Sequence, residues 1–446
     1  MFRLSLGKQR RNCNGLSRRH VLRLGTCGLI GGLTLPRLLE LQAKAAGANV
    51  AKAKSCIFLF LEGGPPHQDM WDPKPQAPVE IRGPFGAIPT NVPDTFVTDQ
   101  LPLCAKMADK YTILRSHSHR DNGHTTGYHY VMTGRRANFA DGDNPVPNND
   151  FYPSIGSAVS RTLGQRGALP PYINLPHPMA GGGPGFYGPE HAPFVIDADP
   201  TQPDFEVKDL QPSSRLSKNR LGLRKRLLTG IDQLERDRNQ GRARVMSTYY
   251  EKAYRLITSP EAKKAFDIHA EPDSMRDTYG RTQIGQCALL ARRLVEGGCR
   301  FVGVDAPGWD VHFNCFPSLK TDLIPYADRA FSALVTDLEQ RGLLDETLVV
   351  MMGEMGRTPR INARAGRDHW SMAQTIIFAG GGTKPGQVIG ATDKHATAPT
   401  GNPVGVNDLL RTISVLMGIN PDREFHGPLG RPVPIVDGGQ VIRDLI

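Results

Sequence analysis

The sequence lacks any apolar run long enough to cross a lipid bilayer, which takes about 20 residues. The main candidate, Leu24–Leu35, is short, rich in glycine and ended by Pro36. The chain also has no internal repeat, no low-complexity segment and no pair of cysteines at CxxC spacing. Most cysteines are therefore expected to be small core residues. One disulfide is possible, but its pairing does not follow from the sequence. A stable membrane span is not expected in the mature chain.

The positive charge is concentrated at the N-terminus rather than spread along the sequence. The 446 residues carry a formal charge of +10, and residues 1–46 account for +8 of it. The rest of the chain, at +2, is close to neutral. Charge therefore gives no reason to expect a nucleic-acid partner.

The basic N-terminus has the order of an export signal. The segment SRRHVLR places Arg18 and Arg19 before the short apolar run, and small residues follow up to Ala46. This order predicts a twin-arginine signal peptide over residues 1–46. The mature protein is then expected in the periplasm or outside the cell.

The length of the chain suits one large α/β domain with insertions or two domains, and does not decide between them. The family resemblance described below covers residues 54–446 as one domain. The 48 glycines and 36 prolines of the chain imply many long ordered loops. Residues 135–270 contain few periodic apolar runs before their basic helical part, so we expect a loop-rich and helical insertion there.

Three apolar segments of strand length are each followed by polar side chains. Ser55–Leu61, Phe301–Val304 and Thr347–Met352 have the continuous apolar character of buried parallel strands. Leu319–Arg341, between the last two, has helical spacing of apolar residues, which predicts a strand–helix–strand unit. The polar residues that follow these strands are Glu62, His67, Asp69, Asp310, His312, Glu354, Arg357, Asp368 and His369.

Open α/β sheets place their sites beyond the carboxyl ends of parallel strands, so these side chains are expected to meet there. Asp310, His312 and His369 have the composition of an open transition-metal site. Glu62 and Glu354 are candidates for holding a second ion. Carboxylate and imidazole ligands suit zinc, manganese or iron, and carboxylate-rich sets also suit magnesium and calcium. Zinc or manganese is expected here, with one or two ions bound.

A histidine-rich segment precedes a predicted helix. His117, His119, His124 and His129 lie within 13 residues, and the helix is expected from about Thr125 to Met132. The N-terminus of such a helix can hold an anion. One or two of these histidines are expected only to pack or to face solvent.

Several longer motifs resemble the DUF1501 family, whose members are exported bacterial proteins, abundant in planctomycetes, of unassigned activity. They are FLFLEGGPPHQDMWDPKP, HTTGYHYVMTGRR, GQCALLARRLVEGG, GWDVH, ETLVVMMGEMGRTP, GRDHW and GGGTKPGQVIGATDKH. In the order of its motifs, DUF1501 is similar to the alkaline phosphatase and sulfatase superfamily. That similarity implies a three-layer α/β/α sandwich with a mostly parallel central sheet, and a metal site at its carboxyl edge.

The resemblance also implies residue roles. Superfamily members place a metal-binding acid after the first strand, which corresponds to Glu62, and an Asp and His after a later one, which match Asp310 and His312. The last histidine matches His369, and Glu354 stands in the remaining acidic position. Ten residues before Gly134, where a Ser, Thr or Cys nucleophile is usual, this sequence has His124 with Thr125 beside it. Met355 also stands where a histidine is common, so the second metal position departs from the pattern.

The resemblance and the residues together suggest a metal-dependent hydrolase of phosphate or sulfate esters, acting on a small molecule or a polysaccharide. Thr125 could attack the ester once deprotonated, or water could attack with His124 transferring the proton. Arg357 could neutralise an ester oxyanion or pair with Glu354. His67, Asp69 and Asp368 are candidates for orienting the ligands or touching substrate. The alternative is a non-catalytic, metal-containing protein that binds a polysaccharide or a protein.

Overall fold

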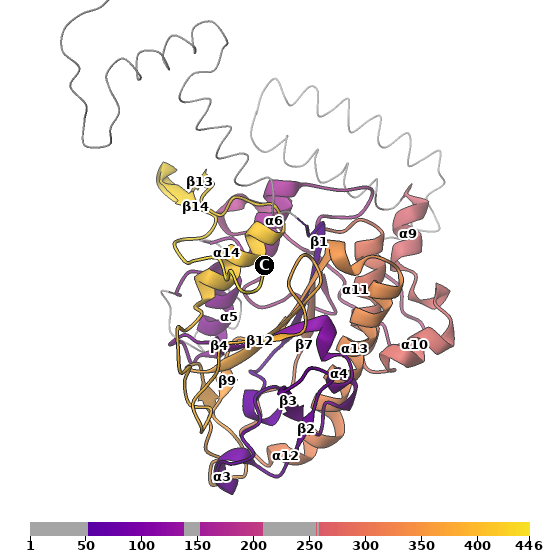
Figure 1. Cartoon of the computed structure of the whole chain (residues 1–446). Coiled ribbons are helices and arrows are strands. Elements are labelled where there is room, and N and C mark those ends of the chain that lie inside the picture. The colour runs from indigo at the N-terminus through magenta and orange to yellow at the C-terminus, as the bar shows by residue number, and fades with distance from the viewer. Residues whose placement is uncertain (1–51, 138–151, 208–255, 257) are drawn as a thin grey trace, which may run out of the picture. The chain divides into compact units, whose positions relative to one another are not determined.

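β1 (Ser55–Leu61) is an inner strand of the main sheet (Figure 1). Every one of its residues is buried. The computed structural model describes residues 52–137, 152–207, 256 and 258–446. The predicted signal peptide, residues 1–46, lies outside these ranges, as do residues 138–151, 208–255 and 257 of the predicted insertion.

One eight-stranded sheet runs through the molecule in the order β12-β4-β11-β8-β1-β7-β5-β6. All neighbouring strands pair in parallel except β11, which is antiparallel to both β4 and β8. The strands are β4 (Tyr111–His117), β5 (Tyr172–Leu175), β6 (Phe194–Val195), β7 (Phe301–Ala306), β8 (Thr347–Met352), β11 (Gln374–Ala379) and β12 (Gln387–Ile389).

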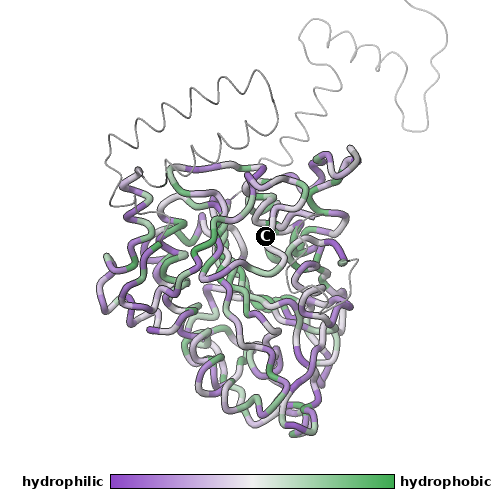
Figure 2. The backbone as a smooth tube through the Cα atoms, turned by 180° about the vertical axis from the view of Figure 1, so that it is seen from behind, coloured by the Kyte–Doolittle hydropathy of each residue, from purple (hydrophilic) through white to green (hydrophobic). Residues whose placement is uncertain are grey.

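Helices cover both faces of this sheet, and the alternating side chains of β1 contact one core on each face. Ile57, Leu59 and Leu61 join the core beneath α4 (Pro102–Ala105), α11 (Gln283–Glu296) and α13 (Ile324–Gln340). Cys56, Phe58 and Phe60 join the opposite core beneath α5 (His124–Thr133), α6 (Ile155–Leu163) and α14 (Val406–Leu416). The expected three-layer α/β/α sandwich with a mostly parallel central sheet is confirmed. Figure 2 shows hydrophobic residues along the inner strands and hydrophilic residues towards the outside.

The remaining helices and strands are short. They are α3 (Val79–Arg82), α9 (Pro260–Phe266), α10 (Asp273–Tyr279), α12 (Cys315–Ser318), β2 (Ala87–Pro89), β3 (Phe96–Thr98), β9 (Gly356–Arg357), β10 (His369–Trp370), β13 (Glu424–His426) and β14 (Pro432–Pro434). β9 and β10 pair with each other outside the main sheet, and they carry two of the predicted site residues.

The strand–helix–strand unit has the predicted parallel strands, and β1 lies between them. β7 and β8 each pair with β1, so α13 connects strands on either side of the centre. This arrangement brings the carboxyl ends of three neighbouring strands to one edge. The predicted loop-rich insertion differs from expectation in one respect, because it also supplies β5 and β6 to the edge of the sheet.

The five cysteines of the described part of the chain are all buried and free, so none of them forms a disulfide with another. Among the described helices, none has the length and apolarity needed for a membrane crossing.

Candidate metal centre

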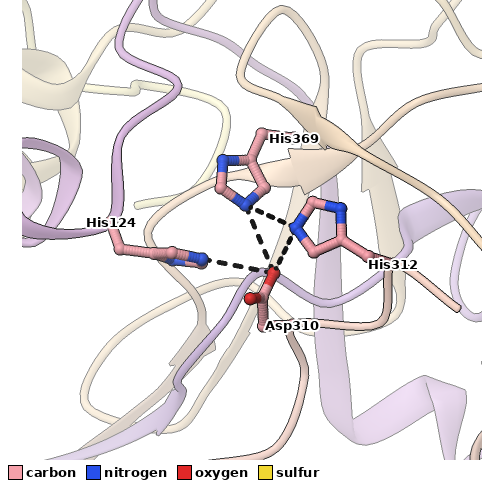
Figure 3. A group of neighbouring side chains, drawn as sticks. All are labelled: His124, Asp310, His312 and His369. Atoms are coloured by element: carbon pink, nitrogen blue, oxygen red, sulfur yellow. Dashed lines mark hydrogen bonds and ion pairs between the residues drawn. The ribbon is translucent and has the colours of Figure 1, made fainter. Parts of the chain in front are cut away.

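Four side chains converge at the carboxyl edge of the sheet: His124, Asp310, His312 and His369 (Figure 3). One ligand atom from each lies within 4.8 Å of those of the others. His124 is the first residue of α5, whereas Asp310 and His312 follow β7 and His369 lies on β10. The structure thus brings the three predicted ligands together with the predicted catalytic histidine.

Oδ1 of Asp310 lies at the centre of this group. It is 2.8 Å from Nε2 of His312 and 3.2 Å from Nε2 of both His124 and His369. Nε2 of His312 lies 2.9 Å from Nε2 of His369. In a tetrahedral zinc site with ligand bonds near 2.0 Å, two ligand atoms lie about 3.3 Å apart, and the spacings here are close to that distance.

Each imidazole is held by its other ring nitrogen, so that Nε2 faces the centre. Nδ1 of His124 lies 2.6 Å from Glu354 Oε1, and Nδ1 of His312 lies 2.8 Å from Asp368 Oδ1. Nδ1 of His369 lies 2.7 Å from the carbonyl oxygen of Asn122. In His312 and His369, an Nδ1 that donates to oxygen leaves the Nε2 lone pair available, which is how proteins orient histidine ligands.

The donor set fits a divalent transition metal. Two neutral imidazoles whose Nε2 lone pairs face each other at 2.9 Å would repel, unless a cation or a proton lies beside them. A carboxylate and imidazole nitrogens are ligands that zinc and manganese accept.

Gly63 allows the loop after β1 to approach Asp310 closely. Its φ is +113°, and a Cβ at this position would lie 2.3 Å from the backbone nitrogen of Asp310. Its own N–H donates to both carboxylate oxygens of Glu354, at 3.1 Å each. Only glycine fits here, so this residue fixes the spacing between the loops that follow β1, β7 and β8.

The pKa values of His124 and Asp310 depend on the contact between these two side chains. Burial lowers the pKa of His124, but hydrogen bonds with Asp310 and Glu354 outweigh burial and raise this pKa to about 9. Burial would raise the pKa of Asp310, but hydrogen bonds from His124, His369 and Arg357 hold it far below its usual range. Asp310 is therefore ionised at neutral pH, as a metal ligand must be.

Residues 53–446 match the model of the DUF1501 family, which is described as a protein of unknown function. The chain belongs to this family. No curated protein matches the sequence.

Some solved structures of ester hydrolases are similar to this DUF1501 chain at low identity. A sulfatase of a Pseudoalteromonas species is 13% identical, with a TM-score of 0.35 over 84% of this chain and 70% of that one. A phosphonate monoester hydrolase of Silicibacter pomeroyi is 14% identical, with a TM-score of 0.39 over 87% and 76%. A TAB5 alkaline phosphatase variant with bound magnesium is 10% identical, with a TM-score of 0.36 over 83% and 100%. None of these scores reaches 0.5, so the chemistry of this family member must be argued from its own residues.

A second group of carboxylates lies beside the centre of the DUF1501 chain. Glu354 is fully buried, and its burial raises its pKa against the opposing contact with His124. Glu62, at the end of β1, lies near Asp305, whose pKa is raised to about 8 by burial and by the charge of Glu62. Glu62 and Glu354 lie outside the four-residue cluster, so a second ion at these two acids stays a prediction.

From the sequence, Arg357 was expected to face an ester oxyanion or to pair with Glu354, and the structure gives it another environment. Its guanidinium is fully buried and contacts Asp310 Oδ1 at 2.6 Å, so its carboxylate partner is Asp310 rather than Glu354. Nε donates to Gly64 O at 3.0 Å, and Nη1 contacts Arg367 O at 3.1 Å and His312 Nε2 at 3.4 Å. Nη2 also donates to Gly63 O. An arginine has five N–H donors, and all of them face protein acceptors here, so Arg357 holds Asp310 rather than facing open space.

Two of the predicted orienting residues contact the loops that carry the ligands. Asp368 contacts Nδ1 of His312, as described above, and Asn362 Nδ2 donates to the same carboxylate oxygen at 3.1 Å. Asp69 is buried and forms a two-pronged ion pair with Arg367, at 2.7 and 2.9 Å. Because Arg367 directly precedes Asp368 and His369, this pair anchors the His369 loop to the loop after β1.

Other candidates lie further from the centre. His67, on the short 3₁₀ helix η1 (His67–Asp69), is buried with Nε2 2.9 Å from Ala396 O, and burial lowers its pKa to about 4. Thr125 is partly exposed at the second position of α5. Of the four clustered histidines, only His124 belongs to the four-residue cluster. His117, His119 and His129 are buried outside it, with His119 Nε2 2.8 Å from the carbonyl oxygen of Glu354.

Asp305 and Asn122 are among the residues of this site that sequence reasoning missed. Asp305 is almost fully buried within the apolar strand β7, and an acid in such a strand is a costly choice that signals a special role. That signal was available in the sequence FVGVDA. Asn122 acts through its backbone carbonyl oxygen, for which the sequence offers no signal.

Proposed function

We propose that this protein is an exported, metal-dependent hydrolase of phosphate or sulfate esters, carried on small molecules or polysaccharides. The supporting observation is the convergence of three Nε2 atoms on Asp310 Oδ1, each imidazole held from behind by an oxygen atom. Such pre-orientation is characteristic of metal ligands and is costly to maintain without a function.

Asp310, His312 and His369 would hold the metal, zinc or manganese, and leave room for water and substrate. A divalent metal supplies Lewis-acid activation of water and of the ester oxygen at such a site. Asp368 and Asn122 fix the two histidine rings, while Arg357 fixes the carboxylate of Asp310. Arg357 is therefore a positioning residue in this proposal.

His124 would deliver the proton to the leaving oxygen. Its Nε2 faces the centre, and its Nδ1 is bonded to the fully buried carboxylate of Glu354. A buried carboxylate behind an imidazole orients the ring and stabilises its protonated form, as in other histidine–carboxylate pairs that move protons. Glu354 is itself held by the N–H of Gly63, so the pair is anchored on two loops.

The test is hydrolysis by the mature protein loaded with zinc or with manganese. The substrates are the p-nitrophenyl esters of phosphate and of sulfate. Wild type should release p-nitrophenol from one of the two esters, and His312→Asn should not, because Asn keeps a donor for Asp368 but removes Nε2. Turnover that survives in His312→Asn would refute the assignment of this centre. Metal binding without turnover of either ester would favour the alternative, a non-catalytic protein that binds a polysaccharide or a protein.

A further inference from the structure

An exposed aromatic side chain lies immediately beside the metal centre. Phe313 follows His312 in the sequence, and the residue is 62% exposed. The centroid of its ring lies 6.3 Å from that of His312. Single exposed apolar residues are common and need no explanation in themselves. The residues around Phe313, however, indicate a role for its exposed ring.

A guanidinium group stands over the Phe313 ring. Cζ of Arg364 lies 4.0 Å from the ring centroid, within the range of a cation–π contact. The Arg364 side chain is 56% exposed, and its nearest carboxylate oxygen, on Asp368, is 3.9 Å away. Unlike Arg357, whose donors all face protein acceptors, Arg364 presents its guanidinium to solvent.

The backbone that carries this pair is unusually constrained. Asn314 has a φ of 38° and Ala365 a φ of 55°, although neither is glycine. These residues sit opposite each other, since Asn314 N donates to Arg364 O at 2.9 Å and Cys315 N donates to Ala365 O at 3.0 Å. Left-handed backbone is unfavourable for non-glycine residues and concentrates at binding sites.

The two loop segments that carry Phe313 and Arg364 are also held close to His312 by hydrogen bonds and close packing. Asn362 Nδ2 donates to His312 O at 3.1 Å, and Asn362 Oδ1 accepts from the backbone N–H of Arg364 at 2.9 Å. A Cβ on Gly366 would lie 2.1 Å from the carbonyl carbon of His312. The position of Phe313 and Arg364 is therefore fixed relative to His312.

We propose that Phe313 and Arg364 form a subsite that binds an anionic carbohydrate. The apolar face of a sugar ring packs on Phe313, while its sulfate, phosphate or carboxylate group accepts hydrogen bonds from the fork of Arg364. The inference rests on the proposed function only in that the ester cleaved at the centre would then be carried by such a sugar. A neutral or purely apolar ligand would leave the exposed guanidinium unused.

The test measures equilibrium binding of dextran sulfate, with neutral dextran as the matched uncharged polymer, by affinity electrophoresis of the mature protein. The variants are Phe313→Ala and Arg364→Ala. Matched controls are Phe96→Ala, another exposed phenylalanine, and Arg360→Ala, an exposed arginine of the same loop. Because all four side chains are exposed, the variants should melt at the temperature of wild type.

Wild type should bind dextran sulfate and not dextran. Phe313→Ala and Arg364→Ala should each weaken that binding about tenfold, the usual loss for a charge-assisted hydrogen bond or a comparable contact. The two controls should stay within twofold of wild type. Absence of binding by wild type, an unchanged Phe313→Ala, or an equal loss in Arg360→Ala would overturn the subsite.

Failure of the hydrolase proposal gives a different pattern. Wild type would then bind dextran sulfate through Phe313 and Arg364 but release no p-nitrophenol from either ester. Conversely, turnover of an ester by wild type, with normal dextran sulfate binding in Phe313→Ala and Arg364→Ala, would refute the subsite alone.

Discussion

His124 is the residue whose role most clearly separates the possible mechanisms. It stands at the start of α5 between the carboxylates of Asp310 and Glu354, at 3.2 and 2.6 Å. We expect His124→Asn to lower kcat by roughly 10²–10⁴-fold, the usual contribution of a general acid or base. The asparagine amide can still donate to Glu354, so the buried carboxylate is not left without a partner.

The matched change is Thr125→Ala, on the next residue of the same helix. If water is the attacking group, this variant should keep most of the activity. Steady-state kinetics with the better p-nitrophenyl ester, together with the metal content of each variant, make the comparison. A larger loss in Thr125→Ala than in His124→Asn, or a phosphorylated threonine trapped from a phosphate ester, would reverse the two roles. Loss of metal in His124→Asn would make His124 a fourth ligand instead.

His67 should make the protein sensitive to acid. Burial lowers its pKa to about 4 in the folded state, from about 6.5 in the unfolded chain. Between these values the unfolded state binds the proton and the folded state does not. The stabilisation is complete above pH 6.5 and is lost as the pH falls through 4, a change on the order of 3 kcal/mol.

Urea unfolding at pH 7 and pH 4 measures this effect, with His67→Gln as the variant. The loss of unfolding free energy on acidification should be smaller in His67→Gln than in wild type. The exposed His426 provides the control, because His426→Gln should behave as wild type. An identical loss in wild type and His67→Gln would show that His67 is not held neutral by the fold.

At the scale of single residues, the sequence predicted which side chains converge better than it predicted the groups that hold them. Asp310, His312 and His369 stand where chemistry and strand ends both indicate a site. Arg357 was expected to face a substrate oxyanion or Glu354, and it contacts Asp310 and backbone carbonyls instead. The partners of a long side chain depend on loops packed from distant parts of the chain, which spacing alone does not reveal.

The loop after β1 is the element on which the geometry of the centre depends. Gly63→Ala would place a methyl group 2.3 Å from the Asp310 nitrogen, in a backbone conformation with φ of +113°. We expect the variant to displace Asp310 and to weaken zinc binding, because a shift of even 1 Å disrupts a coordination site.

Gly342→Ala is the control for backbone strain alone. Gly342 has a φ of +67° and nothing within 4 Å of the position of a Cβ, so alanine there should cost about 1–2 kcal/mol and leave zinc binding unchanged. Calorimetric zinc titration and urea unfolding of both variants make the comparison. Normal zinc affinity in Gly63→Ala would show that the loop can adjust without moving Asp310.

The elements themselves were largely predictable. β1 and β8 have the bounds predicted from their apolar runs, since a strand buried on both faces must be apolar throughout. The antiparallel direction of β11 was not predictable, because an apolar run has the same composition in either direction. β5 and β6 were missed because each is short and lies among glycines and prolines.

At the scale of the whole molecule, we propose that the N-terminal sequence directs export by the twin-arginine route. We expect replacement of Arg18 and Arg19 by lysine to block export, because the twin-arginine route depends on that pair. Replacing Arg10 and Arg11 by lysine is the matched control and should leave export intact. Fractionation of cells that express each variant measures the result. Normal amounts of the Arg18→Lys, Arg19→Lys protein outside the cytoplasm would contradict the prediction.

The central claim is that the carboxyl edge of the sheet holds a divalent transition metal. Calorimetric titration of the metal-stripped protein with zinc tests it most directly, with wild type, His312→Asn and the exposed-histidine control His426→Asn. The account predicts zinc binding in wild type and in His426→Asn, and a loss of affinity of more than about 100-fold in His312→Asn, since even an outer partner of a ligand is worth 10–100-fold. Equal zinc affinity in wild type and His312→Asn, or no binding by any of the three, would contradict the account.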